Sequence, residues 1–441
     1  MPEFRSPEDA VAVDGVDGSN DSALVTAEVA TSEAPPPIPL LVPSGSVAGP
    51  ITERAELADW VDRLTAGDGG PVAIDAERAS GFRYGSRAYL VQLRRPDLGT
   101  VLLDPIPLGD LGVLDAPLAG SEWVLHAASQ DLPCLAEIGI RPRRLFDTEL
   151  AGRLAGLPRV GLGPLVEQML GLHLRKGHGA ADWSTRPLPH DWLVYAALDV
   201  EVLVELRDAM EAELVRQGKL GWAHEEFAAI VAAPPAPPRI DPWRRTSGMH
   251  RITDRRALAV IRELWNTRDS VARRRDVAPH RILPDSAIVA AAAARPTTVG
   301  ALTALPIFSG RMQRRNADLW MSSINRALAL PVDDLPVVRP PGDGPPAPAK
   351  WASRDPVAGA RLQAARVGLA ELSERVGTPV ENLVSPDAVR RVLWSPPEDA
   401  GLGAVAAALA ERGARPWQIE LTAPVLHSAL DAAVVGQVTG Q

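Results

Sequence analysis

The sequence predicts an α+β domain with a mixed central sheet, followed by one or two all-α bundles. Three observations support this prediction: short apolar β-like runs lie between residues 72 and 126, helical periodicity dominates from Asp131 onward, and proline-rich stretches at 232–243 and 336–350 divide the chain. Prolines remove backbone donors and favour extended polyproline II, so both stretches are expected to be semi-rigid spacers. A chain of 441 residues is long enough for about three domains.

The elements of the first domain follow from local periodicity. Leu57, Trp60, Val61 and Leu64 fit one face of a helix that ends near Gly67. Strands are expected at VAID, YLVQLRR and TVLLD, which would form an antiparallel set, with WVLH as a further strand. Helices are expected to make up the rest of this domain.

Acidic side chains come from three separate segments of this domain. Asp75 and Glu77 are an i, i+2 pair after an apolar strand, and Tyr195 and Asp199 lie four residues apart on an expected helix, so each pair shares one face. Asp131 follows WVLH and supplies a further acid. Four nearby carboxylates resist joint ionisation unless something positive lies among them.

Divalent metal is the obvious candidate for that positive charge. Oxygen ligands without an accompanying Cys or His cluster favour Mg²⁺ or Mn²⁺ over Zn²⁺. Two such ions about 3.5–4 Å apart can activate a water and stabilise the leaving oxygen in phosphodiester cleavage, and Tyr195 is suited to orient that water.

Several of these and neighbouring residues could instead have a purely structural role. Asp131 could cap a helix N-terminus, and Asp147 in FDT is expected to begin a helix behind the site. His126 either faces the site or caps its strand. Trp183 could be a core residue and Arg186 a salt-bridge residue.

The stretch from about 52 to 222 resembles the DEDDy 3′→5′ exonuclease domain of the RNase D family, which has a ribonuclease H-like architecture. The matching pieces occur in the family's order: Asp75-Ala76-Glu77, Tyr89–Leu93, His126 with Asp131, Phe146-Asp147-Thr148, Asp182-Trp183-Ser184 with Arg186-Pro187-Leu188, and Tyr195 with Asp199. The resemblance implies metal ligation by Asp75, Glu77, Asp131 and Asp199, with Tyr195 positioning the attacking water. One departure is Arg78, where many relatives carry an aromatic or small residue that contacts the terminal nucleotide.

The resemblance also suggests nucleic-acid contacts around the carboxylates. The segment with Trp183 and Arg186 would shape the wall around the substrate strand, Arg175 and Lys176 would be available for phosphate, and His126 would face the site.

The middle of the chain is strongly basic. Residues 244–330 hold sixteen arginines against six acidic residues. A solvated helix face is the commoner explanation of a charge run, but the excess has one sign, and its arginines fall near expected helix ends or loops, where they can reach phosphates. The arginines expected to bind nucleic acid are Arg273, Arg274, Arg275 and Arg314.

The same region contains Leu264-Trp265, Ala272, Arg281-Ile282-Leu283, Pro296-Thr297-Thr298 and Leu302. In these elements it resembles the helicase and RNase D C-terminal (HRDC) domain, a small helical bundle. Further on, Leu383-Val384-Ser385-Pro386-Asp387 parallels Leu283-Pro284-Asp285, so a second, diverged copy is expected. The expected organisation is a disordered acidic tail (1–50), the exonuclease domain (51–222), a Pro-rich linker (223–247), the HRDC domain (248–330), a second linker (331–350) and the HRDC-like domain (351–431).

Composition limits the compartment and the class of partner. The single cysteine, Cys134, excludes an intramolecular disulfide. The sequence has no apolar run long enough to span a bilayer and no signal-peptide pattern, so we expect a cytoplasmic protein without a membrane partner. The net charge of −9 does not argue against nucleic acid, because residues 1–50 carry eight acidic residues against one arginine.

The resulting hypothesis is a metal-dependent 3′→5′ exoribonuclease that releases nucleoside 5′-monophosphates. By resemblance, its substrates are tRNA precursors or other structured RNA with a free 3′ end. A DNA exonuclease with the same two-metal site is the first alternative, because no motif in the sequence reports a contact to the 2′-hydroxyl. A non-catalytic nucleic-acid-binding scaffold is the second, although no acid of the set and no tyrosine is missing.

Overall fold

The computed structural model describes residues 36–67, 69–175, 177–340, 342 and 344–438. Most of the predicted acidic tail therefore lies outside the described residues. No described helix is both long enough and apolar enough to cross a bilayer.

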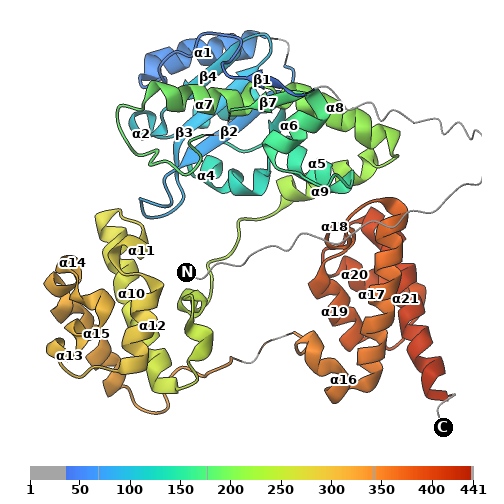
Figure 1. Ribbon diagram of the computed structural model, residues 1–441. Helices are drawn as coiled ribbons and strands as arrows, with labels where there is room; N and C mark the ends of the chain where they lie inside the picture. Colours follow the sequence, from blue (N-terminus) through green and yellow to red (C-terminus); the bar gives the residue numbers. More distant parts are fainter. Residues whose placement is uncertain (1–35, 68, 176, 341, 343, 439–441) are drawn as a thin grey trace, which may run out of the picture. The chain divides into compact units, whose positions relative to one another are not determined.

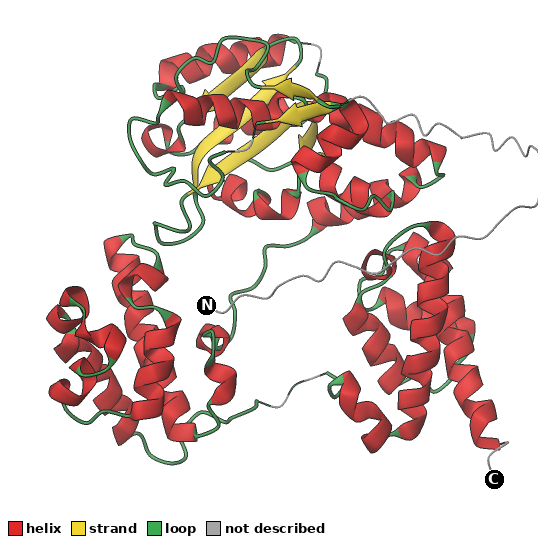
Figure 2. Ribbon diagram, viewed as in Figure 1, coloured by secondary structure: helices red, strands yellow, loops and turns green. Residues whose placement is uncertain are grey.

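A five-stranded mixed sheet forms the centre of the first domain (Figure 2). Its spatial order is β4-β3-β2-β5-β6, with antiparallel pairs among the first three strands and parallel pairs from β2 to β6. The strands are β2 (Val72–Arg78), β3 (Ala88–Arg95), β4 (Gly99–Leu103), β5 (Glu122–Leu125) and β6 (Arg144–Asp147). The predicted mixed sheet is confirmed, but β6 was not expected as a strand.

Helices cover both faces of this sheet (Figure 1). They are α1 (Arg54–Ala66), α2 (Pro105–Leu108), α3 (Asp115–Leu118), α4 (Leu132–Glu137), α5 (Thr148–Leu154), α6 (Leu162–Leu170), α7 (His190–Glu201), α8 (Leu203–Arg216) and α9 (Leu220–Ala232). Successive strand residues face opposite sides, so Leu90 of β3 belongs to the apolar cluster that contains Leu193 of α7, whereas Leu93 belongs to the larger cluster that contains Leu57 and Leu64 of α1. Helix α7 therefore lies on the sheet face that carries Asp75 and Glu77.

Two predicted boundaries are corrected. Residues 38–40 were expected in the disordered tail but form β1 (Ile38–Leu40), whose backbone groups on one side pair in parallel with β7 (Leu172–Leu174). Helix α9 continues through the expected domain end at 222 as far as Ala232, because no proline interrupts it before Pro234.

The remaining described chain is helical, as predicted. The region expected to be HRDC contains α10 (Arg255–Arg275), α11 (Pro279–Ile282), α12 (Asp285–Ala294), α13 (Val299–Thr303), α14 (Arg311–Arg315) and α15 (Ala317–Ala329). The last region contains α16 (Trp351–Arg354), α17 (Pro356–Val376), α18 (Val380–Leu383), α19 (Pro386–Trp394), α20 (Leu402–Ala410) and α21 (Pro416–Val438). Both α10 and α17 have 21 residues, begin at a capping aspartate (Asp254, Asp355) and are followed by a four-residue helix. That the last region is a second, diverged copy of the first helical region stays a prediction.

Candidate active site

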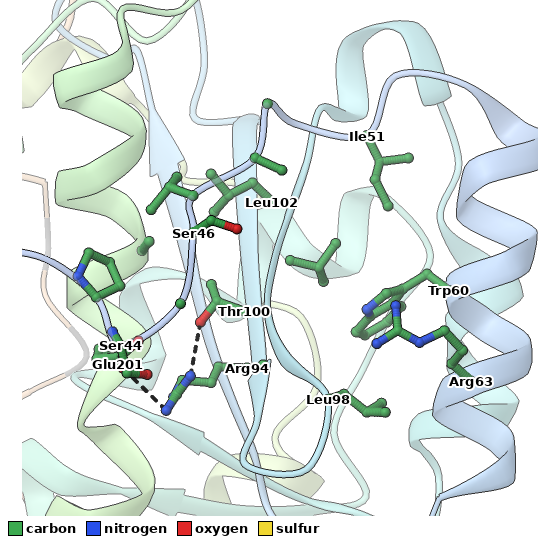
Figure 3. Close-up of a pocket in the computed structure, with 18 of the residues that line it drawn as sticks. Ser44, Ser46, Ile51, Trp60, Arg63, Arg94, Leu98, Thr100, Leu102 and Glu201 are labelled. Carbon is green, nitrogen blue, oxygen red and sulfur yellow. Dashed lines mark hydrogen bonds and ion pairs between the residues drawn. The ribbon is translucent and has the colours of Figure 1, made fainter.

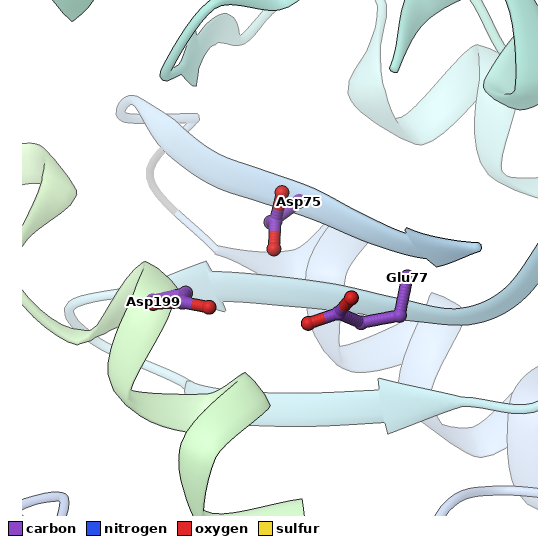
Figure 4. Close-up of side chains that lie close together, drawn as sticks. All are labelled: Asp75, Glu77 and Asp199. Atoms are coloured by element: carbon purple, nitrogen blue, oxygen red, sulfur yellow. The ribbon is translucent and has the colours of Figure 1, made fainter. Parts of the chain in front are cut away.

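Three carboxylates converge between β2 and α7 (Figure 4). One oxygen from each of Asp75, Glu77 and Asp199 lies within 4.8 Å of the other two. Asp75 and Glu77 share a face because they are two residues apart on β2, and α7 packs across that face. The strand pair, Asp75 and Glu77, thus faces the helix residue Asp199, in agreement with the shared faces expected from the sequence.

The electrostatics of this cluster require a positive partner. Burial raises the pKa of Asp75, and burial together with the neighbouring acids raises the pKa of Glu77 to about 10. The pKa of Asp199 is raised well above its ordinary value by burial and then by Asp75. Converging oxygen ligands that cannot all ionise alone fit a hard divalent cation.

Tyr195 lies one helical turn before Asp199 and contributes its phenol to the same pocket. The hydroxyl donates a hydrogen bond to Asp199, and burial followed by the charge of Asp199 raises the pKa of Tyr195. The phenol therefore stays protonated in the metal-free protein.

Two glycines that sequence reasoning did not single out lie against the ring of Tyr195. A Cβ on Gly177 would lie 3.1 Å from Cδ2 of Tyr195, and a Cβ on Gly179 would lie 3.3 Å from its hydroxyl. The residue between them, His178, lies edge-on to the same ring and pairs with Asp191 at 3.3 Å. The Gly-His-Gly pattern before Asp182 is the only sequence signal for this close approach.

Asp131 lies in the adjoining part of the site. It is the residue before α4, but its side chain makes no capping hydrogen bond, so the capping alternative has no support. Its Oδ1 lies 3.4 Å from Nη2 of Arg78, and it lines a cavity of about 330 Å³ with Asp75 and Glu77. Burial and the charge of Asp75 raise its pKa to about 8. Its oxygens do not belong to the close group of three.

Asp147 holds the turn that leads to Asp131. Its carboxylate accepts hydrogen bonds from the backbone N–H groups of Ala127 (3.0 Å) and Ala128 (2.9 Å), and Ala127 has a left-handed φ of 59°. The same carboxylate caps α5 by accepting from Glu149 and Leu150, as the predicted helix start requires. Asp147 is thus a positioning residue, a role that needs tertiary contacts to be seen.

His126 faces the site. It lines both the cavity with Asp131 and a neighbouring cavity of about 370 Å³ that contains Asp75, Tyr195 and Asp199. Its Nδ1 lies 2.9 Å from Oγ1 of Thr148, and burial lowers its pKa to about 4. His126 is therefore neutral near neutral pH.

The structure favours the structural alternative for two predicted nucleic-acid contacts. Trp183 is fully buried in the apolar cluster under α7. The guanidinium of Arg186 pairs with Asp104 at 2.6 and 2.8 Å and donates to the carbonyl oxygens of Tyr89 and Trp183. Packing thus encloses Trp183, and hydrogen bonds to Asp104 and to backbone carbonyls engage the guanidinium of Arg186, which favours a structural role for both.

The other predicted contacts differ in their surroundings. Lys176 lies outside the described residues, whereas Arg175 lines the cavity beside Tyr195. Arg273 is exposed and pairs with Asp269 on its own helix at 3.1 Å. Arg274, Arg275 and Arg314 are exposed, and no hydrogen bond or ion pair to their guanidinium groups exists within the described ranges.

Another cavity, of about 350 Å³, lies away from the carboxylates, between residues 43–51, α1 and the β3-β4 hairpin (Figure 3). Its two least exposed charged groups pair with each other: Arg94 lies 3.3 Å from Glu201, and the same Glu201 oxygen accepts from Ser44. The chemistry therefore belongs to the cluster of Figure 4.

Comparison with known proteins gives the same domain sequence. The family models for a 3′-5′ exonuclease, the HRDC domain and a 3′ to 5′ exonuclease C-terminal domain match residues 49–215, 257–324 and 344–430. A ribonuclease D from Gluconacetobacter diazotrophicus is 34% identical over 310 residues, which are 68% of this chain and 77% of that protein. One from Acidiphilium cryptum is 34% identical over 305 residues, 67% of this chain and 76% of that protein.

The chain belongs to the ribonuclease D family. It is therefore a 3′→5′ exonuclease, and the predicted fold of an exonuclease domain followed by an HRDC domain is confirmed. The third matched model gives the last region a description of its own, distinct from HRDC.

Solved structures in the family's fold agree. A crystal structure of a protein from Bifidobacterium adolescentis has a TM-score of 0.82 and 38% identity, covering 90% of this chain and all of that one. Escherichia coli RNase D, described as an exoribonuclease involved in structured RNA processing, has a TM-score of 0.63 and 26% identity, covering 87% of this chain and 98% of that one.

Proposed function

We propose that this ribonuclease D relative releases nucleoside 5′-monophosphates one at a time from RNA 3′ ends. The observation that carries the proposal is the group of three carboxylates, from β2 and α7, with oxygens within 4.8 Å of one another. Such a group is costly in a folded protein unless a cation binds there.

Each residue has a distinct role in the proposed reaction. Asp75, Glu77, Asp131 and Asp199 would hold two divalent cations, Mg²⁺ or Mn²⁺. When bound, the cations activate a water and neutralise charge on the attacked phosphodiester. Tyr195 keeps its proton, donates to Asp199 and has an oxygen lone pair left to accept from the attacking water.

The RNA itself is proposed to contact two parts of the chain. His126 and Arg175 line the cavities at the carboxylates and would contact the 3′-terminal nucleotides. Arg274, Arg275 and Arg314 would contact phosphates further along the strand. The leading substrates are tRNA precursors and other structured RNA with a free 3′ end.

The test uses matched RNA strands labelled at the 5′ or the 3′ end, with Mg²⁺ or with chelator. We expect the 3′ label to appear as a mononucleotide while the 5′-labelled strand shortens stepwise, and we expect both reactions to stop in chelator. Asp75→Asn should be inactive, whereas Asp59→Asn, which removes an exposed acid of α1, should be as active as the native chain.

The same assay separates the alternatives. Faster digestion of a matched DNA strand would favour the DNA exonuclease. Retained cleavage by Asp75→Asn, or by the native chain in chelator, would contradict the metal site.

A further inference from the structure

Arg78 is a cation inside the acidic site. It directly follows Glu77 on β2, and the register between β2 and β3 shifts between these two residues. A strand irregularity of this kind re-aims the side chain beside it. The guanidinium reaches the turn before α4, where Nη1 donates to the carbonyl oxygen of Gln130 at 2.7 Å and Nη2 lies 3.4 Å from Oδ1 of Asp131.

This ion pair is shielded from water on one side. The side chain of Asp131 is 6% exposed and that of Arg78 is 29% exposed. Solvent therefore screens their attraction less than it would on an open surface. The positive charge also favours ionisation of Asp75 and Glu77, since it opposes the rise of the pKa of both groups.

Asp131 consequently has two possible positive partners. Asp75, Glu77 and Asp199 lie close enough together to share one cation, whereas Asp131 is directed at Arg78 and is not part of that group. Asp75, Glu77, Arg78 and Asp131 nevertheless line one cavity, so a cation bound there would lie near both Asp131 and the guanidinium.

We propose that Arg78 competes with the second divalent cation for Asp131. A cation bound at Asp75, Glu77 and Asp199 keeps these three ligands during the exchange, whereas a cation next to Asp131 binds only when the guanidinium leaves that carboxylate. Arg78 thereby sets the metal concentration at which the site fills. This inference rests on the proposed metal ligation by Asp131.

The test measures metal binding directly, without turnover. The full chain, stripped with chelator, is titrated with Mn²⁺ by calorimetry, and Mg²⁺ is measured by competition. Arg78→Met removes the charge but keeps a long side chain, so the weaker binding step should tighten by about threefold to tenfold, the range expected for loss of one partly shielded ion pair. Arg78→Lys keeps a cation at the site and should remain closer to the native chain.

Two controls isolate the exchange at Asp131. Arg141→Met removes an exposed arginine near the amino end of β6, the opposite end from the carboxylates, and should leave both binding steps unchanged. In an Asp131→Asn background, Arg78→Met should give no further gain, because the contested carboxylate is gone. Circular dichroism and the unfolding temperature in chelator check that each variant is folded.

The outcomes separate this inference from the proposed function. Unchanged or weaker binding by a folded Arg78→Met chain, or an equal gain in the Asp131→Asn background, would overturn the competition. Loss of both binding steps in Asp75→Asn would still support the metal site itself. A native chain that binds no divalent cation would overturn both.

Discussion

The carboxylate site and the arginine-rich region α10–α15 both concentrate charge of one sign, but the fold treats the two sets differently. Arg268 is buried, pairs with Asp285 at 2.6 Å and donates to the carbonyl of Leu283, and Arg255 donates to two backbone carbonyls. Their charges are satisfied by the protein. In the cluster of Asp75, Glu77 and Asp199, Glu77 is buried and the two aspartates are half-buried, Arg78 is the nearby cation, and the pKa values of all three acids are raised.

The two regions therefore differ in which charged groups are available to a ligand. The number of arginines alone does not show this, because arginines such as Arg255 and Arg268 hydrogen-bond to other parts of the protein. Arg274, Arg275, Arg311, Arg314 and Arg315 are exposed and have no partner among the described residues. They, and the carboxylates, are the groups that the fold leaves unneutralised.

The largest expected effect comes from removing one acid of the cluster. Asp199→Asn should lower kcat/KM by about 10³-fold or more, because it removes a proposed metal ligand, and a bound cation would supply several kcal/mol of transition-state stabilisation. The same change should raise the unfolding temperature of the chelated protein by about 2–4 °C, because it removes an ionisable group whose charged form is disfavoured by burial and then by Asp75. Activity assays and thermal scans in chelator measure the two effects; a destabilised chelated variant would show that the charge of Asp199 is not unfavourable in the metal-free fold.

A smaller effect is expected from a substitution of Gly177, which lies against the ring of Tyr195. Gly177→Ala places a methyl group 3.1 Å from the ring, so the phenol must shift, and kcat should fall by about tenfold with little change in KM. Tyr195→Phe should lower kcat by about 10²-fold.

A double-mutant cycle shows whether the glycine acts through the phenol. In the Tyr195→Phe background, Gly177→Ala should have almost no additional effect, because no hydroxyl remains to be displaced. If the losses of kcat in the two single variants multiply in the double variant, Gly177 does not act through the hydroxyl of Tyr195 and has a merely structural role.

The exposed arginines should act on binding alone. Arg274→Gln, Arg275→Gln and Arg314→Gln together should raise KM several-fold at about 0.15 M salt, leave kcat unchanged, and reduce the slope of log affinity against log salt by about one for each lost phosphate contact. Arg268→Gln is the matched control, since it should lower the stability of the helical region instead. An unchanged salt slope in the triple variant would contradict the proposed contact of these arginines with RNA phosphates.

The smallest effect is a pH dependence of stability without metal. The pKa values of Glu77, about 10, and Asp131, about 8, lie above their ordinary values, so the folded state binds more protons than the unfolded state in the intervening range. The free energy of unfolding of the chelated chain should therefore fall as pH rises from about 5 to 8. Denaturant titrations with and without Mg²⁺ check this, because saturating metal should flatten the dependence.

Local spacing explains why much of the site could be predicted. An i, i+2 pair on a strand and an i, i+4 pair on a helix fix the shared faces of Asp75 with Glu77 and of Tyr195 with Asp199 without any tertiary information. Strand β6 has four residues and no alternating pattern, so RLFD gave no strand signal beside the helix-start signal of Asp147.

The remaining contacts depend on partners far away in the sequence. Arg186 meets Asp104 across 82 positions, and Asp147 meets Ala127 across 20. The pairing of Arg78 with Asp131 also depends on a register shift that no composition or periodicity reports.

The most direct test of the central claim is a crystal of the full chain soaked in Mn²⁺, with the anomalous signal recorded. We expect an anomalous peak coordinated by Asp75, Glu77 and Asp199, with a second peak beside Asp131 once Arg78 has moved away. Saturating Mn²⁺ that leaves these carboxylates without any peak would contradict it.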